Sequence, residues 1–240
     1  MLRAVTFDCW GTLIADSDTA GAARARTDAV VRLAGGRVDA ERARALLERA
    51  WTIHHDRWLA GEQFGAPGIA KLCVDELALG PDAEVELCHA FEEAGESYTV
   101  EPLPGAGDTL ELLRSSGVPT ALVCDTGYTP GRVVRRLLAR HRLELDHYVF
   151  SDEVGVPKPD PRMFHTALDA IDAQPRESAH VGDLLQTDIK GGRAVGMRTI
   201  RITGYTQPNI READGLTEAD EVVASHAELP DALRRLGLQV

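Results

Sequence analysis

The sequence predicts an α/β protein in which an all-helical cap is inserted into a Rossmann-like parallel sheet core. The chain has 240 residues, which is enough for one core domain and a smaller insert. From residue 99 onward, short β-prone runs alternate with helical patterns, as is typical of βαβ units and a parallel sheet. Between residues 15 and 94 only helical periodicity occurs, and no strand is expected there.

The first β-prone run, residues 2–7, ends at a polar turn. Asp8 follows it directly, and Gly11 and Thr12 come three and four residues later. Because a glycine turn rather than a helix follows, we expect the Asp8 carboxylate to project from the carboxyl end of the first strand. A simple turn-forming aspartate would give the same local pattern.

A block of amphipathic helices follows the first strand. Apolar residues recur at three- and four-residue spacing in four segments that Gly or Pro separates: 20–34, 40–59, 69–79 and 83–91. We therefore assign residues 15–98 to the helical cap and residues 1–14 and 99–240 to the core, with hinges near 13–16 and 96–104.

The remaining chain alternates between strands and helices. We expect strands at 120–124, 148–150, 179–181 and 198–202, and helices at 107–116, 131–140, 161–170 and 188–194. Asp125 and Thr126 follow one of these strands, and Asp183 follows another. Ligands of an open parallel sheet bind at the carboxyl ends of its strands. The sequence therefore brings Asp8, Asp125 and Asp183 to one edge of the sheet.

Composition narrows the class of protein. The formal net charge of -12 disfavours a non-specific nucleic-acid surface, which needs a basic stripe. No apolar stretch approaches the ~20 residues of a membrane span, and no leader pattern opens the chain. The four cysteines are widely spaced, which favours reduced thiols and a cytoplasmic location over a disulfide frame. The oligomeric state, monomer or homodimer, stays open.

Four polar segments outside the insert stand in a fixed order: DCWGT at 8–12, CDT at 124–126, KPDP at 158–161 and GDLLQTD at 182–188. Together they resemble the motifs of the haloacid dehalogenase-like hydrolase superfamily, of the phosphatase type with a helical cap. The first is similar to D-x-D-x-T and the last to G-D-x-x-x-x-D, and the insert matches the family's cap in position and size. One motif alone would be weak, but four in order are specific.

This resemblance implies a Mg²⁺-dependent phosphohydrolase that acts on a small phosphorylated metabolite. Asp8 would be the nucleophile that accepts the phosphoryl group as an aspartyl-phosphate, and Lys158 would neutralise charge beside it. Mg²⁺ prefers oxygen ligands, which Asp8, Asp183 and the backbone carbonyl of Trp10 could supply. Asp188 would assist as a further carboxylate, either on the metal or behind it.

The resemblance also implies a substrate-binding set, namely Thr12, Cys124, Asp125, Thr126 and Lys158. Cys124 stands where the family has a hydroxyl, and a thiol is the weaker donor. Either Thr126 and nearby backbone N–H groups take over, or Cys124 is only a small buried residue that ends a strand. Asp183 could also be a plain loop carboxylate, and Asp188 could be the N-cap of the helix at 188–194.

Trp10 departs from the phosphatase pattern. The family's phosphatases have a second Asp at this position, which protonates the leaving oxygen and later activates water. An indole can do neither, and the loss of a general acid–base typically costs about 10²–10⁴ in rate. The loss matters less when the leaving group is a weak base, as in an acyl or aryl phosphate.

Two alternatives follow from Trp10. The superfamily's dehalogenases usually have an aromatic residue there, because halide needs no proton, but they resemble S-x-N where this chain has Gly182 and Asp183. They also need an early arginine for the substrate carboxylate, for which Arg24 and Arg26 are candidates. The second alternative is a weakly catalytic phosphate-binding or interaction module.

Aromatic and histidine side chains gather on one cap helix. His54 and Trp58 share a face at a spacing of four, as do Trp51 and His55. One pair could contact the substrate or supply the missing acid. Packing in the cap interior is the more common use of such residues.

Overall fold

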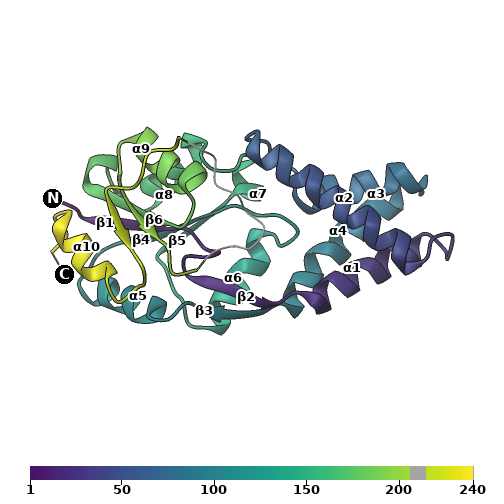
Figure 1. Ribbon diagram of the computed structural model, residues 1–240, viewed down its shortest axis with the longest axis horizontal. Coiled ribbons are helices and arrows are strands. Elements are labelled where there is room, and N and C mark those ends of the chain that lie inside the picture. Colours follow the sequence, from purple (N-terminus) through teal and green to yellow (C-terminus); the bar gives the residue numbers. More distant parts are fainter. Residues whose placement is uncertain (206–214, 240) are drawn as a thin grey trace. The chain divides into compact units, whose positions relative to one another are not determined.

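The computed structural model describes residues 1–205 and 215–239. These form two compact units, whose elements are shown in Figure 1. The core unit comprises Met1–Ala15, Val100–Asp125 and Leu138–Val240, and the cap unit comprises Asp16–Thr99 and Thr126–Leu137. The segment that follows Asp125 therefore groups with the cap helices, although it comes after a strand of the core.

The predicted fold class is confirmed, because a parallel sheet forms the centre of the core unit. In the described residues this sheet has six strands in the order β5-β4-β1-β6-β7-β8. Their bounds are β1 (Ala4–Phe7), β4 (Thr120–Cys124), β5 (His147–Phe150), β6 (Ser178–Gly182), β7 (Arg198–Ile202) and β8 (Glu221–Val223). Every pairing is parallel. Every residue of β1, β4 and β6 is buried, as expected for central strands with helices on both faces.

Helices cover both faces of the sheet. In Figure 1, α8 and α9 lie on one face, and α5 and α10 lie on the other. The bounds are α5 (Ala106–Ser115), α6 (Gly131–Arg140), α7 (Ser151–Val154), α8 (Pro161–Ala170), α9 (Lys190–Val195) and α10 (Leu229–Arg235). Met163 and Phe164 of α8 pack against Ala121 and Val123 of β4. Burying one such large side chain contributes about 1.5–3 kcal/mol, so this layer stabilises the core unit.

The cap unit is a helical bundle. Its helices are α1 (Ala20–Leu33), α2 (Ala40–Leu59), α3 (Gly65–Leu77) and α4 (Asp82–Glu93), followed by a 3₁₀ turn at Ala94–Ser97. Asp39 caps α2 by accepting a 2.8 Å hydrogen bond from the Arg42 amide. Ile69, Leu87 and Phe91 are fully buried in the bundle interior. The predicted helical character of the insert is confirmed.

Two short strands lie where the hinges were expected. β2 (Ile14–Asp18) and β3 (Thr99–Pro102) form a two-stranded sheet. The expectation that no strand occurs after residue 15 is therefore wrong at the start of the insert. The segment IADSD carries no alternation of apolar residues that would announce a strand, and its partner lies about eighty residues away in the chain. Pairing of this kind is set by tertiary structure.

Candidate active site

Three carboxylates follow neighbouring strands of the sheet. Asp8 follows β1, Asp125 follows β4, and Asp183 follows β6. Because β1 lies between β4 and β6 and all three are parallel, these residues meet at one edge. The sheet order thus produces the convergence that the sequence predicted.

A tight loop follows Asp8. The Leu13 amide donates to the Cys9 carbonyl at 2.8 Å, and the Gly11 amide donates to the Ile14 carbonyl at 2.8 Å. Gly11 has a φ of 79°, which a side-chain-bearing residue rarely adopts. Thr12 and Trp10 lie within this loop, and Thr12 is fully buried. The loop is therefore fixed by its own backbone.

His226 supports the same loop from the C-terminal part of the chain. Its Nε2 lies 2.7 Å from the Thr12 carbonyl, and its Nδ1 lies 3.2 Å from the Thr109 hydroxyl. The carbonyl can only accept, so Nε2 carries the proton. Burial lowers the pKa of His226, while the Thr12 carbonyl opposes this shift. A neutral imidazole therefore holds Thr12 in place.

Lys158 lies at the centre of the site. Its Nζ is 2.5 Å from Asp8 Oδ1 and 2.7 Å from Asp188 Oδ1, and the side chain is 2% exposed. The Lys158 amide donates to Asp125 Oδ1 at 2.8 Å, which anchors the backbone beneath the ammonium. Burial alone would lower the pKa of Lys158, but Asp188 and Asp8 raise it well above its usual value. One ammonium is therefore shared by two carboxylates.

The two carboxylates differ in their surroundings. Burial alone would raise the pKa of Asp188, but Lys158 and His180 hold this pKa below its usual range. Its Oδ2 also accepts from the Leu184 amide at 3.0 Å. Burial raises the pKa of Asp8 to about 6, although Lys158 acts in the opposite direction. Asp188 is thus the fixed anion, and Asp8 is the carboxylate that gains most from a further cation.

Asp8, Asp183 and Asp188 form a cluster that could hold a metal ion. One carboxylate oxygen from each lies within 4.8 Å of the others, and all three residues are buried. Among the described residues, Asp8 Oδ2 is buried and has no hydrogen-bond partner. An unpartnered buried carboxylate oxygen among oxygen donors fits Mg²⁺, which prefers such ligands. Both oxygens of Asp188 already accept hydrogen bonds, so Asp8 and Asp183 are the better-placed ligands.

Asp188 does not begin a helix as the N-cap alternative required. It lies in a π-helical turn at Leu185–Ile189, and α9 begins only at Lys190. Gly182 makes room for it, because a Cβ on Gly182 would lie 2.4 Å from the Asp188 Cβ. The first glycine of the predicted motif therefore permits the close approach of its last aspartate.

The predicted phosphate-binding residues fall into two groups. The Cys124 thiol donates to the Asp125 carbonyl at 3.3 Å, and burial raises its pKa well above the usual value. Cys124 is fully buried at the end of β4, which is compatible with the alternative of a small buried residue that ends a strand. Thr126 lies in the cap unit, where Gln63 Nε2 lies 3.4 Å from its hydroxyl.

Sequence reasoning missed two residues of the site, Thr6 and His180. Both are fully buried on paired central strands. Their side chains lie 2.8 Å apart, between Thr6 Oγ1 and His180 Nδ1. The sequence does show a hydroxyl and an imidazole within two mostly apolar strands, but only the strand register brings these side chains together.

The cap histidines pack differently from the prediction. The contacting pairs are three residues apart, with Trp51 against His54 at 4.8 Å and His55 against Trp58 at 5.3 Å between ring centroids. His54 is buried, and its Nδ1 accepts from the Gly65 amide at 3.3 Å. Burial, followed by the neighbouring His55, lowers the pKa of His54 to about 4. A ring that is neutral at pH 7 and already bonded is poorly suited to be the missing acid.

Arg26, a candidate for a carboxylate-binding arginine, lies in the cap interior. Its Nε donates to the Phe91 carbonyl at 3.1 Å, and its Nη1 donates to the Tyr98 hydroxyl at 3.0 Å. The guanidinium lies 4.2 Å from the centroid of the Tyr128 ring. These contacts tie α1 to α4 and to the segment after β4, which is a packing role.

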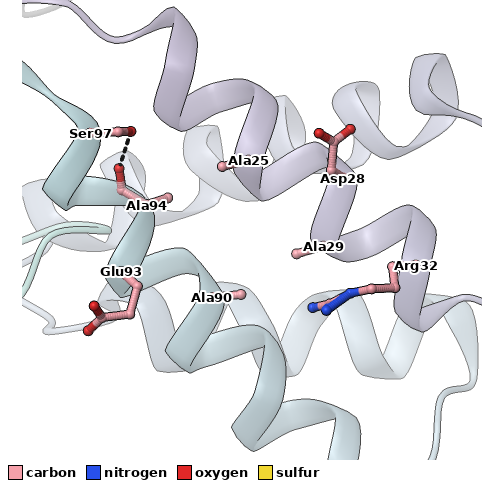
Figure 2. A pocket seen from close by; sticks show the side chains of 8 residues that line it. All are labelled: Ala25, Asp28, Ala29, Arg32, Ala90, Glu93, Ala94 and Ser97. Carbon is pink, nitrogen blue, oxygen red and sulfur yellow. Dashed lines mark hydrogen bonds between the residues drawn. The ribbon is translucent and has the colours of Figure 1, made fainter.

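A groove between α1 and α4 is separate from the carboxylate cluster. Figure 2 shows its floor of four alanines, with charged residues at the rim. The lining residues are Ala25, Asp28, Ala29, Arg32, Ala90, Glu93, Ala94 and Ser97. None of them is a predicted site residue, and the short apolar floor offers no reactive group.

Comparison with known proteins identifies the family. The family model described as haloacid dehalogenase-like hydrolase matches residues 2–196. This is most of the chain, so the chain belongs to the haloacid dehalogenase-like hydrolase family. In the described residues, no helix combines the length and apolar character needed to cross a membrane.

Relatives in the family carry different names. Glyceraldehyde 3-phosphate phosphatase of Methanopyrus kandleri is 27% identical over 244 residues, which cover 98% of this chain and 99% of that protein. Haloacid dehalogenase-like hydrolase domain-containing protein 3 of Bos taurus is 32% identical over 152 residues, covering 62% and 57%. (S)-2-haloacid dehalogenase 1 of a Pseudomonas species is 30% identical over 141 residues, covering 58% and 59%. The chain spans a little over half the length of the first curated relatives that it matches.

Solved structures support the fold. A 2-haloacid dehalogenase from Pseudomonas syringae superposes with a TM-score of 0.67 at 23% identity, covering 98% of this chain and 99% of that one. A HAD phosphatase from Thermococcus onnurineus gives a TM-score of 0.65 at 23% identity, covering 97% and 98%. Since both activities occur on this fold, the fold alone does not choose between them.

Proposed function

We propose that this member of the haloacid dehalogenase-like hydrolase family is a Mg²⁺-dependent phosphohydrolase that forms an aspartyl-phosphate on Asp8. One observation carries the proposal. Lys158 Nζ lies 2.5 Å from Asp8 Oδ1, while Asp8 Oδ2 has no hydrogen-bond partner in the part of the chain that the structure describes. One oxygen is thus oriented by an ammonium, and the other is available to a cation or a phosphorus atom.

The chain's own residues supply the nucleophile and its charge balance. The Asp8 carboxylate attacks phosphorus, the P–O bond to the leaving group breaks, and the acyl phosphate on Asp8 is later hydrolysed by water. Lys158, fixed between two carboxylates, neutralises negative charge on the phosphoryl group as it approaches. Asp125 holds the Lys158 backbone, and Asp188 holds its ammonium.

The residues present fit a magnesium ion. Asp8 and Asp183 would hold it, with Asp188 close behind and the Trp10 carbonyl as the predicted backbone ligand. When bound, Mg²⁺ would offset phosphate charge and help to orient the phosphoryl group. Of these residues, Asp8 is the one whose second oxygen the described chain leaves without a hydrogen-bond partner.

Trp10 sets the expected substrate class. It occupies the position of the family's acid–base aspartate, and the buried, neutral His54 does not supply a replacement at pH 7. A leaving group that departs without a proton is therefore favoured, as in an acyl or aryl phosphate. The Methanopyrus kandleri relative is named for glyceraldehyde 3-phosphate, an alkyl phosphate, so its name supports a small phosphorylated metabolite but not this choice of leaving group.

A panel assay tests this proposal. We expect inorganic phosphate release from acetyl phosphate and p-nitrophenyl phosphate in Mg²⁺, weaker release from alkyl phosphates, and loss of activity in Asp8→Asn. EDTA should abolish turnover. Absence of phosphate release from every member of the panel would overturn the proposal.

Dehalogenation is the second candidate, because Trp10 is an aromatic residue and halide needs no proton. The chain aligns at 30% identity with (S)-2-haloacid dehalogenase 1 over 141 residues. Against it stand the third carboxylate, Asp183, and the packing role of Arg26. Halide release from 2-chloropropionate in the presence of EDTA would favour dehalogenation, and its absence would exclude it.

We also propose a cytoplasmic enzyme that binds neither membranes nor nucleic acid. All four cysteines are free thiols, as a reducing compartment would leave them. The net charge of -12 opposes attraction to a phosphate backbone. We expect no binding to DNA at low or high salt, and recovery of the protein in the cytosolic fraction. DNA binding, or recovery with membranes, would contradict this proposal.

A further inference from the structure

Thr6 and His180 form a buried polar pair behind the reactive groups. They lie opposite each other in the register of β1 and β6, and neither is exposed at all. Apart from Ser178 at the start of β6, the two strands, AVTF and SAHVG, are otherwise apolar. An unsatisfied buried polar group costs about 1–3 kcal/mol, so these two side chains must be held by hydrogen bonds. Their partners lead into the site.

Both ring nitrogens of His180 are engaged. Nδ1 lies 2.8 Å from Thr6 Oγ1, and Nε2 lies 3.3 Å from Asp188 Oδ1. The Asp188 oxygen also accepts from Lys158 Nζ at 2.7 Å, so it acts as an acceptor. Nε2 must therefore donate to it, so that if the ring carries one proton, Nδ1 accepts from the Thr6 hydroxyl. With one proton on the ring, this arrangement pairs both nitrogens.

The surrounding packing fixes the ring. The Phe164 ring meets it edge-to-face, with centroids 5.0 Å apart. Gly192 leaves room beside it, because a Cβ there would lie 3.2 Å from the His180 Cβ. The imidazole therefore has little freedom to turn away from Asp188.

We propose that Thr6 and His180 are positioning residues, which orient the Asp188 carboxylate and through it place the Lys158 ammonium against Asp8. Neither touches the reacting atoms. Asp188, which can only accept, fixes the tautomer of His180, and Thr6 holds the other ring nitrogen. His180 in turn orients Asp188, and Asp188 orients Lys158. The inference rests on the proposed function only for the measurements of turnover. The hydrogen-bond arrangement itself can be tested without any reaction.

Five variants separate positioning from packing. His180→Gln keeps a donor near Nε2, His180→Asn keeps only the atom near Nδ1, and His180→Phe keeps the volume but neither bond. Thr6→Val removes the hydroxyl at constant shape, and Thr6→Ser restores it. Mutation of such supporting residues typically costs about 10–100-fold in activity, and we expect that loss in kcat for His180→Phe, His180→Asn and Thr6→Val. His180→Gln and Thr6→Ser should stay within a few fold of the wild type.

The measurements are kcat and KM with p-nitrophenyl phosphate in Mg²⁺, and thermal unfolding of each variant. Positioning predicts a fall in kcat with little change in KM, and rescue by His180→Gln and Thr6→Ser. If activity instead follows only the folded fraction, or if His180→Gln is no better than His180→Phe, the proposal is wrong. Thr6→Val, the mildest change, keeps the test open should the His180 variants fail to fold.

A reaction-free readout separates this inference from the proposed function. Nitrogen-15 NMR of the metal-free protein reports which ring nitrogen of His180 carries the proton, and His180→Phe assigns the signal. We expect the proton on Nε2 in the wild type, and the same tautomer in Thr6→Val, because Asp188 still accepts from Nε2. A proton on Nδ1 in the wild type would overturn the inference, whatever the enzyme hydrolyses. The expected tautomer in a protein without phosphatase activity would remove only the proposed function.

Discussion

The two units bury their polar residues in different ways. At the carboxyl edge of the core sheet, Asp8, Lys158, Asp188 and His180 share hydrogen bonds in one continuous network. In the cap interior, Arg26 and His54 belong to separate small sets of contacts, with backbone groups, a tyrosine hydroxyl and aromatic rings, that contain no buried ion pair among the described residues. A network in a rigid sheet can hold charges where a reaction needs them. Isolated polar groups in a helical bundle mainly fix its packing.

The largest test of this contrast removes the central charge of the core network. Lys158→Met should leave Asp188 as a buried anion without its main partner, which costs about 3–5 kcal/mol of unfolding free energy. Urea unfolding at pH 7 measures it. Lys71→Met is the matched control, because that lysine pairs with Asp75 on an exposed helix surface and its loss should be within experimental error. Equal losses for the two variants would contradict the contrast.

A pH titration tests the single buried histidine of the cap. The pKa of His54 is lowered by burial from 6.5 to about 4, so its neutral form contributes stability that is present above pH 6.5 and is lost as the pH falls toward 4. Between pH 7.5 and 4.5 the wild type should lose about 2–3 kcal/mol more than His54→Gln, which cannot ionise.

His165→Gln serves as the control for that titration, since His165 lies on the exposed face of α8. Urea unfolding at the two pH values supplies the comparison. An equal loss in wild type and His54→Gln would show that the buried ring is not what makes the cap acid-sensitive.

Gly182→Ala tests how closely the network is packed. The added Cβ would lie 2.4 Å from two Asp188 atoms and must displace that carboxylate. We expect a loss of about 1–3 kcal/mol, together with lower kcat, since overpacking distorts the site. Gly80→Ala is the control because nothing lies within 4 Å of its added Cβ. Wild-type activity in Gly182→Ala would mean that the position of Asp188 is not critical.

Trp10→Asp tests whether an acid–base group is missing at this position, and it has the smallest expected effect. A carboxylate at this position should raise kcat/KM for an alkyl phosphate by roughly tenfold, less than the 10²–10⁴ of a fully positioned acid. It should change the value for acetyl phosphate little, because that leaving group needs no proton. The measurement is the ratio of kcat/KM for the alkyl phosphate to kcat/KM for acetyl phosphate. An unchanged ratio would show that residue 10 does not occupy the position of a general acid.

Much of the site was predictable because it follows from general rules. Asp8, Asp125 and Asp183 each follow a buried β-prone run, and parallel strands bring their carboxyl ends to one edge. The proposed role of Lys158 rests on the order of the motifs, since a lysine between two prolines indicates no function by itself. The helices of the insert followed from apolar periodicity.

The rest depended on non-local geometry. Thr6 and His180 meet because of strand register, and no local pattern fixes that register. Asp188 lies in a π-helical turn that sequence periodicity cannot distinguish from the first turn of a helix. β2 and β3 pair across the whole insert, and their polar segments carry no strand signal of their own.

The most direct test of Asp8 as the nucleophile is phosphoryl trapping. The protein is mixed with acetyl phosphate and Mg²⁺, quenched in acid and analysed by intact and peptide mass spectrometry. We predict a transient mass increase of one phosphoryl group on the peptide that carries Asp8, accumulating because Trp10 cannot activate water for the second step. The modification should be absent in Asp8→Asn. Rapid phosphate release with no phosphoryl group on Asp8, or an undiminished rate in Asp8→Asn, would contradict the mechanism.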